Sequence, residues 1–305
     1  MSERFWMTGL VPATFTPMRE DGSLNLSVVA PMVEHLLARG ATALFVCGST
    51  GESAAMTTAE RMATVEAFIA AAAGRIPVVA HVGHTALADA RDLAAHAQRV
   101  GAAAIAALPP FYVKPASVDV LVACMAEIAA AAPALPFYYY HIPGLTGVNL
   151  DMVGFLRRGA ERIPTLAGIK YSSPTLYEFL ACVALEDGRF NMVFGVDEML
   201  LSGLAAGAHG AVGSTFNMAA PLYHEAMALF AAGKLAEAQR LQTLSAQMVL
   251  RLIAKYRPLP ALKAMMKFVG LDCGPVRLPQ VALTPAEIDA LQRDLDQMGF
   301  LAWMR

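Results

Sequence analysis

Eight short apolar runs recur along the chain, and longer stretches rich in alanine and leucine separate them. Each run is nearly continuous rather than alternating, which is typical of strands buried on both faces of a parallel sheet. The runs are 10–15, 43–47, 77–81, 103–107, 136–140, 165–170, 192–194 and 210–212. The stretches between them predict helices near 26–39, 58–73, 86–99, 117–132, 150–160, 174–186, 197–207 and 218–232.

Residues that start and end helices support this alternation. Thr57 and Glu60 have the spacing of a capping box at the start of the second helix. Gly40, Gly101 and Gly233 follow helical stretches, where a left-handed glycine ends a helix at little cost. The capping residues and the hydrophobic periodicity therefore predict the same boundaries.

Eight strand–helix units make up a (β/α)8 TIM barrel. An open doubly wound sheet is the alternative, but it normally carries a glycine-rich phosphate loop, and the sequence has no such motif. Beyond residue 233 the strand signals stop, and helices are expected at 234–256, 260–270 and 285–298. We therefore divide the chain into a catalytic barrel, residues 1–225, and a C-terminal helical extension, residues 226–305.

Composition excludes several classes of protein. Hydrophobic residues make up 56% and charged residues 16%, which favours a large buried core over a disordered chain. The net charge of −2 gives no electrostatic reason to expect nucleic acid as a partner. Four scattered cysteines form no CxxC pair and no zinc-type cluster, so we expect reduced thiols, no metal and a cytoplasmic location. No apolar run reaches the roughly 18 residues that a membrane span needs.

Polar residues gather where five of the predicted strands end. They are 48–52 after the second run, 140–143 after the fifth, Lys170 in the sixth, 195–198 after the seventh and 213–215 after the eighth. Because the active sites of such barrels lie at the C-terminal ends of the strands, we expect these five segments to meet at one mouth.

Lys170 ends the apolar run Leu166–Ile169, and it is the residue of this sequence that most clearly indicates a catalytic function. Burial at the end of an interior strand favours the neutral amine, which can attack a ketone and form a Schiff base. The protonated imine then withdraws electrons, as cleavage of a β-hydroxy ketone requires. A lysine at the rim paired with a carboxylate is the alternative interpretation.

Side chains from the neighbouring segments fit the same chemistry. The Gly48–Gly51 stretch offers two hydroxyls and several N–H groups that suit a carboxylate, although such residues also form ordinary turns. Strand alternation points Tyr138 and Tyr140 to one side and Tyr139 to the other. The Tyr140 phenol could therefore transfer protons beside a Schiff-base lysine. His141 is expected to hydrogen-bond backbone at the rim.

Taken together, these segments resemble the dihydrodipicolinate synthase / N-acetylneuraminate lyase superfamily. The motifs that carry the resemblance are Gly48-Ser49-Thr50-Gly51-Glu52, Tyr140-His141-Ile142-Pro143, Gly168-Ile169-Lys170 and Gly213-Ser214-Thr215. Their order and spacing cover residues 8–217. The resemblance implies a (β/α)8 barrel with a C-terminal helical domain, a homotetramer, and a class I aldolase that needs no cofactor.

Two further stretches, 130–148 and 194–198, resemble the lyase branch, particularly its animal-type form. This branch cleaves N-acetylneuraminate to N-acetylmannosamine and pyruvate. Synthases usually have an arginine where this chain has Leu145, and they lack the Asp197–Glu198 pair. Gly144 departs from the alanine common in lyases, with no functional consequence that we can identify.

The resemblance assigns a role to each matching residue. Lys170 would form the Schiff base, Tyr140 would transfer the proton, and Ser49 and Thr50 would hold the substrate carboxylate. Tyr112 would reach the site of a neighbouring subunit. The sugar hydroxyls would be held by Ser172, the Gly195 carbonyl, Asp197, Glu198 and Ser214.

Two other functions stay open at this point. One is a different pyruvate-dependent Schiff-base aldolase or dehydratase that acts on 2-keto-3-deoxy sugar acids. The other is a non-catalytic regulator that binds a sugar acid on the same barrel. Lys170 and Tyr140 together disfavour the regulator, because binding alone needs neither group.

Overall fold

Eight parallel strands form one sheet in the computed structural model, which describes residues 5–304. The strands are β1 (Gly9–Pro12), β2 (Leu44–Val46), β3 (Val78–His81), β4 (Ala104–Ala107), β5 (Phe137–His141), β6 (Leu166–Tyr171), β7 (Asn191–Phe194) and β8 (Gly210–Gly213). Their order is β1-β8-β7-β6-β5-β4-β3-β2. A parallel bridge between Ala13 and Phe45 brings β1 back to β2. The predicted (β/α)8 barrel is therefore confirmed.

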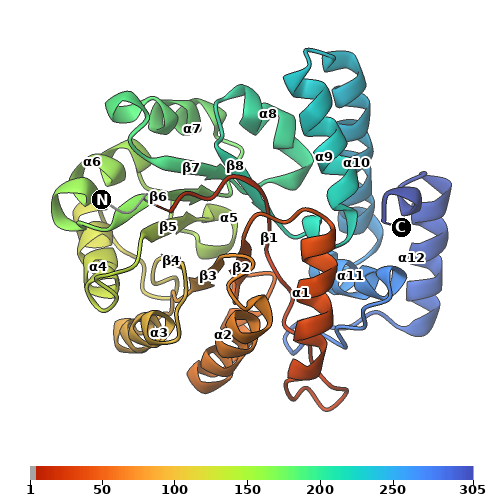
Figure 1. Cartoon of the computed structure of the whole chain (residues 1–305), viewed down its shortest axis with the longest axis horizontal. Helices are drawn as coiled ribbons and strands as arrows, with labels where there is room; N and C mark the ends of the chain where they lie inside the picture. Colours follow the sequence, from red (N-terminus) through yellow and green to blue (C-terminus); the bar gives the residue numbers. More distant parts are fainter. Residues whose placement is uncertain (1–4, 305) are drawn as a thin grey trace.

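Helices surround this sheet on its outer face, as Figure 1 shows. They are α1 (Val29–Ala38), α2 (Thr58–Ala72), α3 (Leu87–Arg99), α4 (Val118–Ala130), α5 (Pro143–Thr146), α6 (Met152–Arg162), α7 (Leu176–Val183), α8 (Leu200–Ala205) and α9 (Phe216–Ala231). Among these α-helices of residues 5–304, the single turn α5 alone has no counterpart among the helices expected in the barrel. Among residues 5–304, no helix combines the length and apolarity needed to cross a membrane.

The C-terminal helices lie together on one side of the barrel, next to α9 and α1 (Figure 1). They are α10 (Leu235–Lys255), α11 (Pro258–Met265) and α12 (Pro285–Gln297). The proposed division after residue 225 falls inside α9, so this helix both completes the barrel and leads into the extension. Residues 1–4 and 305, the outer ends of the two proposed parts, lie outside the described chain.

The predicted caps are present. The Glu60 N–H donates to Thr57 Oγ1 at 3.2 Å, and the Thr57 N–H donates to Glu60 Oε2 at 2.9 Å, which completes the capping box of α2. Gly40, Gly101 and Gly233 all have positive φ angles. Local sequence therefore fixes where these elements begin and end.

Two apolar layers follow from the alternation of side chains along β5. Tyr138 and Tyr140 pack inside the barrel, whereas Tyr139 packs between the sheet and the helices. His141 belongs to the strand and is fully buried on the same outer side as Tyr139, 4.8 Å between ring centroids from Tyr171. Neither ring nitrogen has a partner within the described chain, so the expected backbone bond at the rim was wrong. The period of two in a strand turns this ring away from the mouth.

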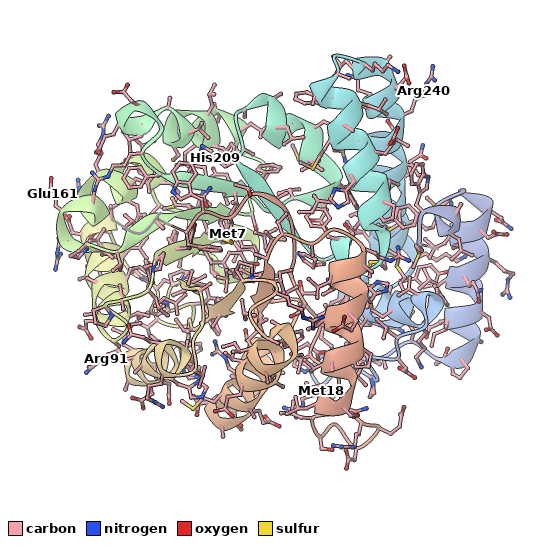
Figure 2. The ribbon with its side chains drawn as sticks, viewed as in Figure 1. Met7, Met18, Arg91, Glu161, His209 and Arg240 are labelled. Carbon is pink, nitrogen blue, oxygen red and sulfur yellow. The ribbon has the colours of Figure 1, made fainter. Side chains whose placement is uncertain are left out.

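The N-terminal segment closes the end of the barrel opposite the predicted site. The Met7 N–H donates to Asn191 Oδ1 at 2.8 Å, and Asn191 Nδ2 donates to the Met7 carbonyl at 3.0 Å. Figure 2 shows Met7 on the segment that crosses the strands. Among the described residues, Met7 and Asn191 thus cover this end of the barrel, and the cavity lies at the C-terminal ends of the strands.

Candidate active site

A cavity of about 660 Å³ opens at the C-terminal ends of the strands. All five polar segments expected at this mouth contribute residues to it, which confirms that the fold brings them together. From the predicted set it is lined by Ser49, Thr50, Tyr140, Lys170, Ser172, Gly195, Asp197 and Ser214. Its size is in the range of small-molecule sites.

Lys170 lies at the base of this cavity, on β6, and is only 3% exposed. Its Nζ is 4.0 Å from the ring centroid of Phe45 and 4.0 Å from that of Tyr140. No carboxylate among residues 5–304 forms an ion pair with Lys170. The alternative interpretation, a lysine at the rim paired with a carboxylate, is therefore wrong. The amine is held between two aromatic faces and is sheltered from water.

The hydroxyls of Ser49 and Thr50 are held by one side chain from β5 and one from the residue that follows β8. Ser49 Oγ lies 3.3 Å from the Tyr140 hydroxyl, and Thr50 Oγ1 lies 2.6 Å from Ser214 Oγ. The loop is flanked by two non-glycine residues with left-handed backbone, Cys47 at φ 58° and Glu52 at φ 57°. Such a conformation costs about 1–2 kcal/mol per residue, so the surrounding structure holds this loop in place.

Asp197 is 8% exposed and binds the start of α9. Its Oδ2 accepts hydrogen bonds from the N–H of Thr215 at 2.9 Å and from Thr215 Oγ1 at 2.6 Å. Burial raises the pKa of Asp197, and the hydrogen bonds from Thr215 oppose that shift. A Cβ on Gly213 would lie 2.1 Å from Asp197 Oδ1, so only glycine leaves room for the carboxylate.

Ser172 and Gly195, which directly follow β6 and β7, form a similar pair. A Cβ added to Gly195 would lie 2.1 Å from Ser172 Oγ. The Ser172 N–H donates to the His141 carbonyl at 2.7 Å, which anchors the backbone beneath the hydroxyl. Because Gly195 has no side chain, the Ser172 hydroxyl can occupy its position at the cavity wall.

Two residues of the predicted set do not line the cavity. Glu198 is half-buried, and its pKa is raised by burial and by the neighbouring Asp197 charge. Tyr112 is 86% exposed, while the adjacent Phe111 lines the cavity in its place. A role for Tyr112 in catalysis would require a site on another subunit.

Several lining residues were not predicted from the sequence. Glu52 belongs to the Gly48–Glu52 motif, but the sequence predicted no role for it. The C-terminal extension also contributes lining residues, namely Pro258, Leu259, Leu262, Arg277, Pro279 and Gln280. Local periodicity indicates that 258–265 is helical but contains no signal that it reaches the barrel mouth. Within the described chain, no group of three or more His, Cys, Asp or Glu side chains could hold a metal ion.

The chemistry of the site follows from this arrangement. A buried lysine without an acidic partner can condense with a ketone, and a phenol lies directly beside it. Hydroxyls from two loops and a buried carboxylate complete the wall of the cavity. The barrel and this site define a class I aldolase, a carbon–carbon lyase that works through a lysine Schiff base.

Comparison with known proteins identifies the family. The model of the dihydrodipicolinate synthetase family matches residues 6–298, and the chain belongs to this family. It is 41% identical over 276 residues to N-acetylneuraminate lyase of Xenopus tropicalis, covering 90% of each chain. It matches the structure of Proteus mirabilis N-acetylneuraminate lyase with a TM-score of 0.94 at 35% identity, covering 97% of this chain and 100% of that one. A catalytic lysine mutant of Ruminococcus gnavus sialic acid aldolase matches with a TM-score of 0.90 at 27% identity, covering 97% and 96%.

Proposed function

We propose that this protein is an N-acetylneuraminate lyase, which cleaves N-acetylneuraminate to N-acetylmannosamine and pyruvate. The observation that carries the proposal is the buried Lys170 amine beside the Tyr140 ring, at the base of a cavity that also holds the Asp197 carboxylate. Relatives and solved structures that bear this activity in their names support it.

The proposed reaction starts from the open-chain sugar acid. Lys170 condenses with the ketone and water leaves, which gives a protonated imine. Tyr140, acting through the substrate carboxylate, accepts the proton of the C4 hydroxyl. The C3–C4 bond then breaks, and its electron pair moves to the imine nitrogen as N-acetylmannosamine departs. The resulting enamine takes up a proton at carbon, and hydrolysis releases pyruvate and the free lysine.

Ser49 and Thr50 are proposed to bind the substrate carboxylate. Their hydroxyls are held toward Tyr140 and Ser214, which brings carboxylate recognition next to the lysine. The sugar chain would extend from there toward its proposed partners. These are Ser172, the Gly195 carbonyl, Asp197, Glu198 and Ser214.

The charges around the cavity favour a polyhydroxylated chain over a second carboxylate. Leu145, at the position where synthases usually have an arginine, lines the cavity with an apolar side chain. Arg277 also lines it, but its guanidinium donates to the Gly22 and Ala55 carbonyls and to both oxygens of Glu60. A diacid substrate would therefore meet the Asp197 carboxylate, and among the described residues that line the cavity only the reacting lysine would be an available cation.

We also propose that the protein is a cytoplasmic homotetramer. The exposed Tyr112 supports an assembly in which this side chain reaches a neighbouring subunit's site. Mass measurement in solution tests this part, and a monomer with full activity would contradict the role of Tyr112.

The proposed substrate is tested by comparing kcat/KM for pyruvate release from N-acetylneuraminate and from 2-keto-3-deoxygluconate. A clear preference for N-acetylneuraminate is expected. A preference for the deoxy acid would instead indicate the related aldolase. Tight binding of N-acetylneuraminate without pyruvate release would indicate a sugar-acid-binding regulator.

A further inference from the structure

The loop that carries Ser49 and Thr50 ends at Glu52, and the C-terminal extension binds both oxygens of the Glu52 carboxylate. Lys263 Nζ, on α11, donates to Oε1 at 2.6 Å, and the Arg277 N–H donates to Oε2 at 2.8 Å. The side chains of Lys263 and Glu52 are 1% and 2% exposed, so water is excluded from the ion pair. One carboxylate thus joins the loop to two separate stretches of the extension.

The ammonium group of Lys263 makes a second contact that fixes its own position. It donates to the Pro275 carbonyl at 2.7 Å. Arg277, two residues further along, is bound through its side chain to Glu60 on α2. The groups that hold Glu52 are therefore themselves attached to the barrel and to the extension, and the contact is a rigid one.

The backbone of the loop needs such an attachment. Glu52 has left-handed backbone angles, φ 57° and ψ 31°, which a non-glycine residue keeps only where its surroundings enforce them. Its N–H donates to the Ser49 carbonyl at 3.1 Å, and the Ser53 N–H donates to the Gly48 carbonyl at 3.3 Å. A shift at Glu52 would therefore be transmitted directly to the residue that carries the first hydroxyl.

Stability alone does not explain a buried pair of this kind. Taking two charges out of water is costly, and well-packed apolar side chains often stabilise a fold as well or better. What the pair supplies is a fixed position for the carboxylate, because each of its oxygens has one donor in one direction. A fixed carboxylate in turn fixes the loop that places Ser49 against Tyr140 and Thr50 against Ser214.

We infer that Glu52 is a positioning residue, through which Lys263 and the Arg277 backbone orient the Ser49 and Thr50 hydroxyls for the carboxylate of the keto acid. The extension is then part of the carboxylate site although it carries none of the donors. This inference rests on the proposed use of Ser49 and Thr50, and it concerns only the pyruvate half of the substrate.

The test uses full-length wild-type protein and the variants Glu52→Gln and Lys263→Gln. Borohydride trapping of pyruvate on Lys170 gives the half-saturating pyruvate concentration. Condensation at saturating pyruvate gives the half-saturating N-acetylmannosamine concentration. Asp294→Asn is the matched control, because it replaces another carboxylate of low exposure, one that binds Lys255 and Tyr256 within the extension.

The expected result is a rise of about tenfold or more in half-saturating pyruvate for Glu52→Gln, the effect of one misplaced donor to a charged group. Maximal trapping and half-saturating N-acetylmannosamine should stay within about twofold of wild type, as should all constants of the control. Lys263→Gln removes the ammonium group that fixes Oε1 of Glu52, so the same rise is expected, and this variant replaces the first if that one does not fold.

Wild-type pyruvate affinity in either folded variant would overturn the inference. Equal losses for pyruvate and N-acetylmannosamine would also overturn it, because they would indicate a general loss of structure. Trapping requires pyruvate alone. A wild-type protein that traps pyruvate but does not join it to N-acetylmannosamine would contradict the proposed substrate and leave this inference standing.

Discussion

Replacing Thr215 with valine should weaken binding of the sugar chain while leaving pyruvate chemistry intact. The substitution keeps the shape of the side chain and removes the hydroxyl that lies 2.6 Å from Asp197 Oδ2. The Thr215 N–H still binds the same oxygen, and Tyr223 keeps its contact with Ser245 at 2.8 Å. The fold should therefore survive, although the substitution removes two buried contacts, the hydrogen bond to Asp197 Oδ2 and the one of 2.7 Å to the Tyr223 hydroxyl.

The expected loss in kcat/KM follows from the hydrogen bond between Thr215 Oγ1 and Asp197 Oδ2. A hydrogen bond to a charged group contributes about 1.5–3 kcal/mol, which corresponds to roughly a 10- to 150-fold loss in kcat/KM for N-acetylneuraminate. Burial already raises the pKa of Asp197, and loss of the Thr215 hydroxyl should raise it further. The acid limb of the kcat/KM profile should therefore move to higher pH in the variant.

Steady-state kinetics over a range of pH, together with borohydride trapping of pyruvate, measure both effects. Thr243→Val is the matched control, because its hydroxyl is exposed on α10 and donates only to the Gln239 carbonyl. Unchanged kcat/KM in Thr215→Val would refute a role for Asp197 in holding the substrate. An equal loss of pyruvate trapping would refute the assignment of Asp197 to the sugar end.

Three further predictions concern the site wall, acid stability and the thiols. Gly195→Ala should displace the Ser172 hydroxyl and raise KM for N-acetylneuraminate by about tenfold, with pyruvate trapping unchanged; equal losses in both assays would contradict this. The bond from Arg277 lowers the pKa of Glu60 from 4.5 to about 2, so its stabilising contribution is present above about pH 4.5 and is lost as the pH falls toward 2. Arg277→Ala should remove roughly 1–3 kcal/mol at pH 7 and flatten this acid dependence in denaturant titrations, and an unchanged acid dependence would count against the pair. Three thiols are buried and Cys124 is half-buried, so a thiol reagent at pH 8 should modify Cys124 alone before unfolding; rapid reaction of all four would be inconsistent with this packing.

The barrel could be predicted because strands buried on both faces produce apolar runs that are visible in a single sequence. The same alternation along β5 placed Tyr140 inside the barrel and Tyr139 outside it, as the structure has them. Lys170 stood out because a charged residue ends an otherwise apolar strand. These predictions depend on a few neighbouring residues, where sequence carries most of the information.

The parts of the site that sequence missed depend on long-range contacts. Glu52 and Lys263 are 211 residues apart, and no local pattern indicates that α11 reaches the barrel mouth. Asp197 and Glu198 are adjacent in a short 3-10 turn, so their side chains point in different directions and only Asp197 lines the cavity. His141 was misplaced because the strand continues by one residue beyond its expected end.

The central claim is that Lys170 forms the Schiff base with the keto acid. Wild-type protein and Lys170→Ala should be incubated in parallel with N-acetylneuraminate and borohydride, followed by mapping of the reduced adduct and measurement of pyruvate release. We expect pyruvate release and an adduct on the Lys170 peptide in the wild type, with neither in a folded Lys170→Ala variant. Substantial pyruvate release by that variant would contradict the account.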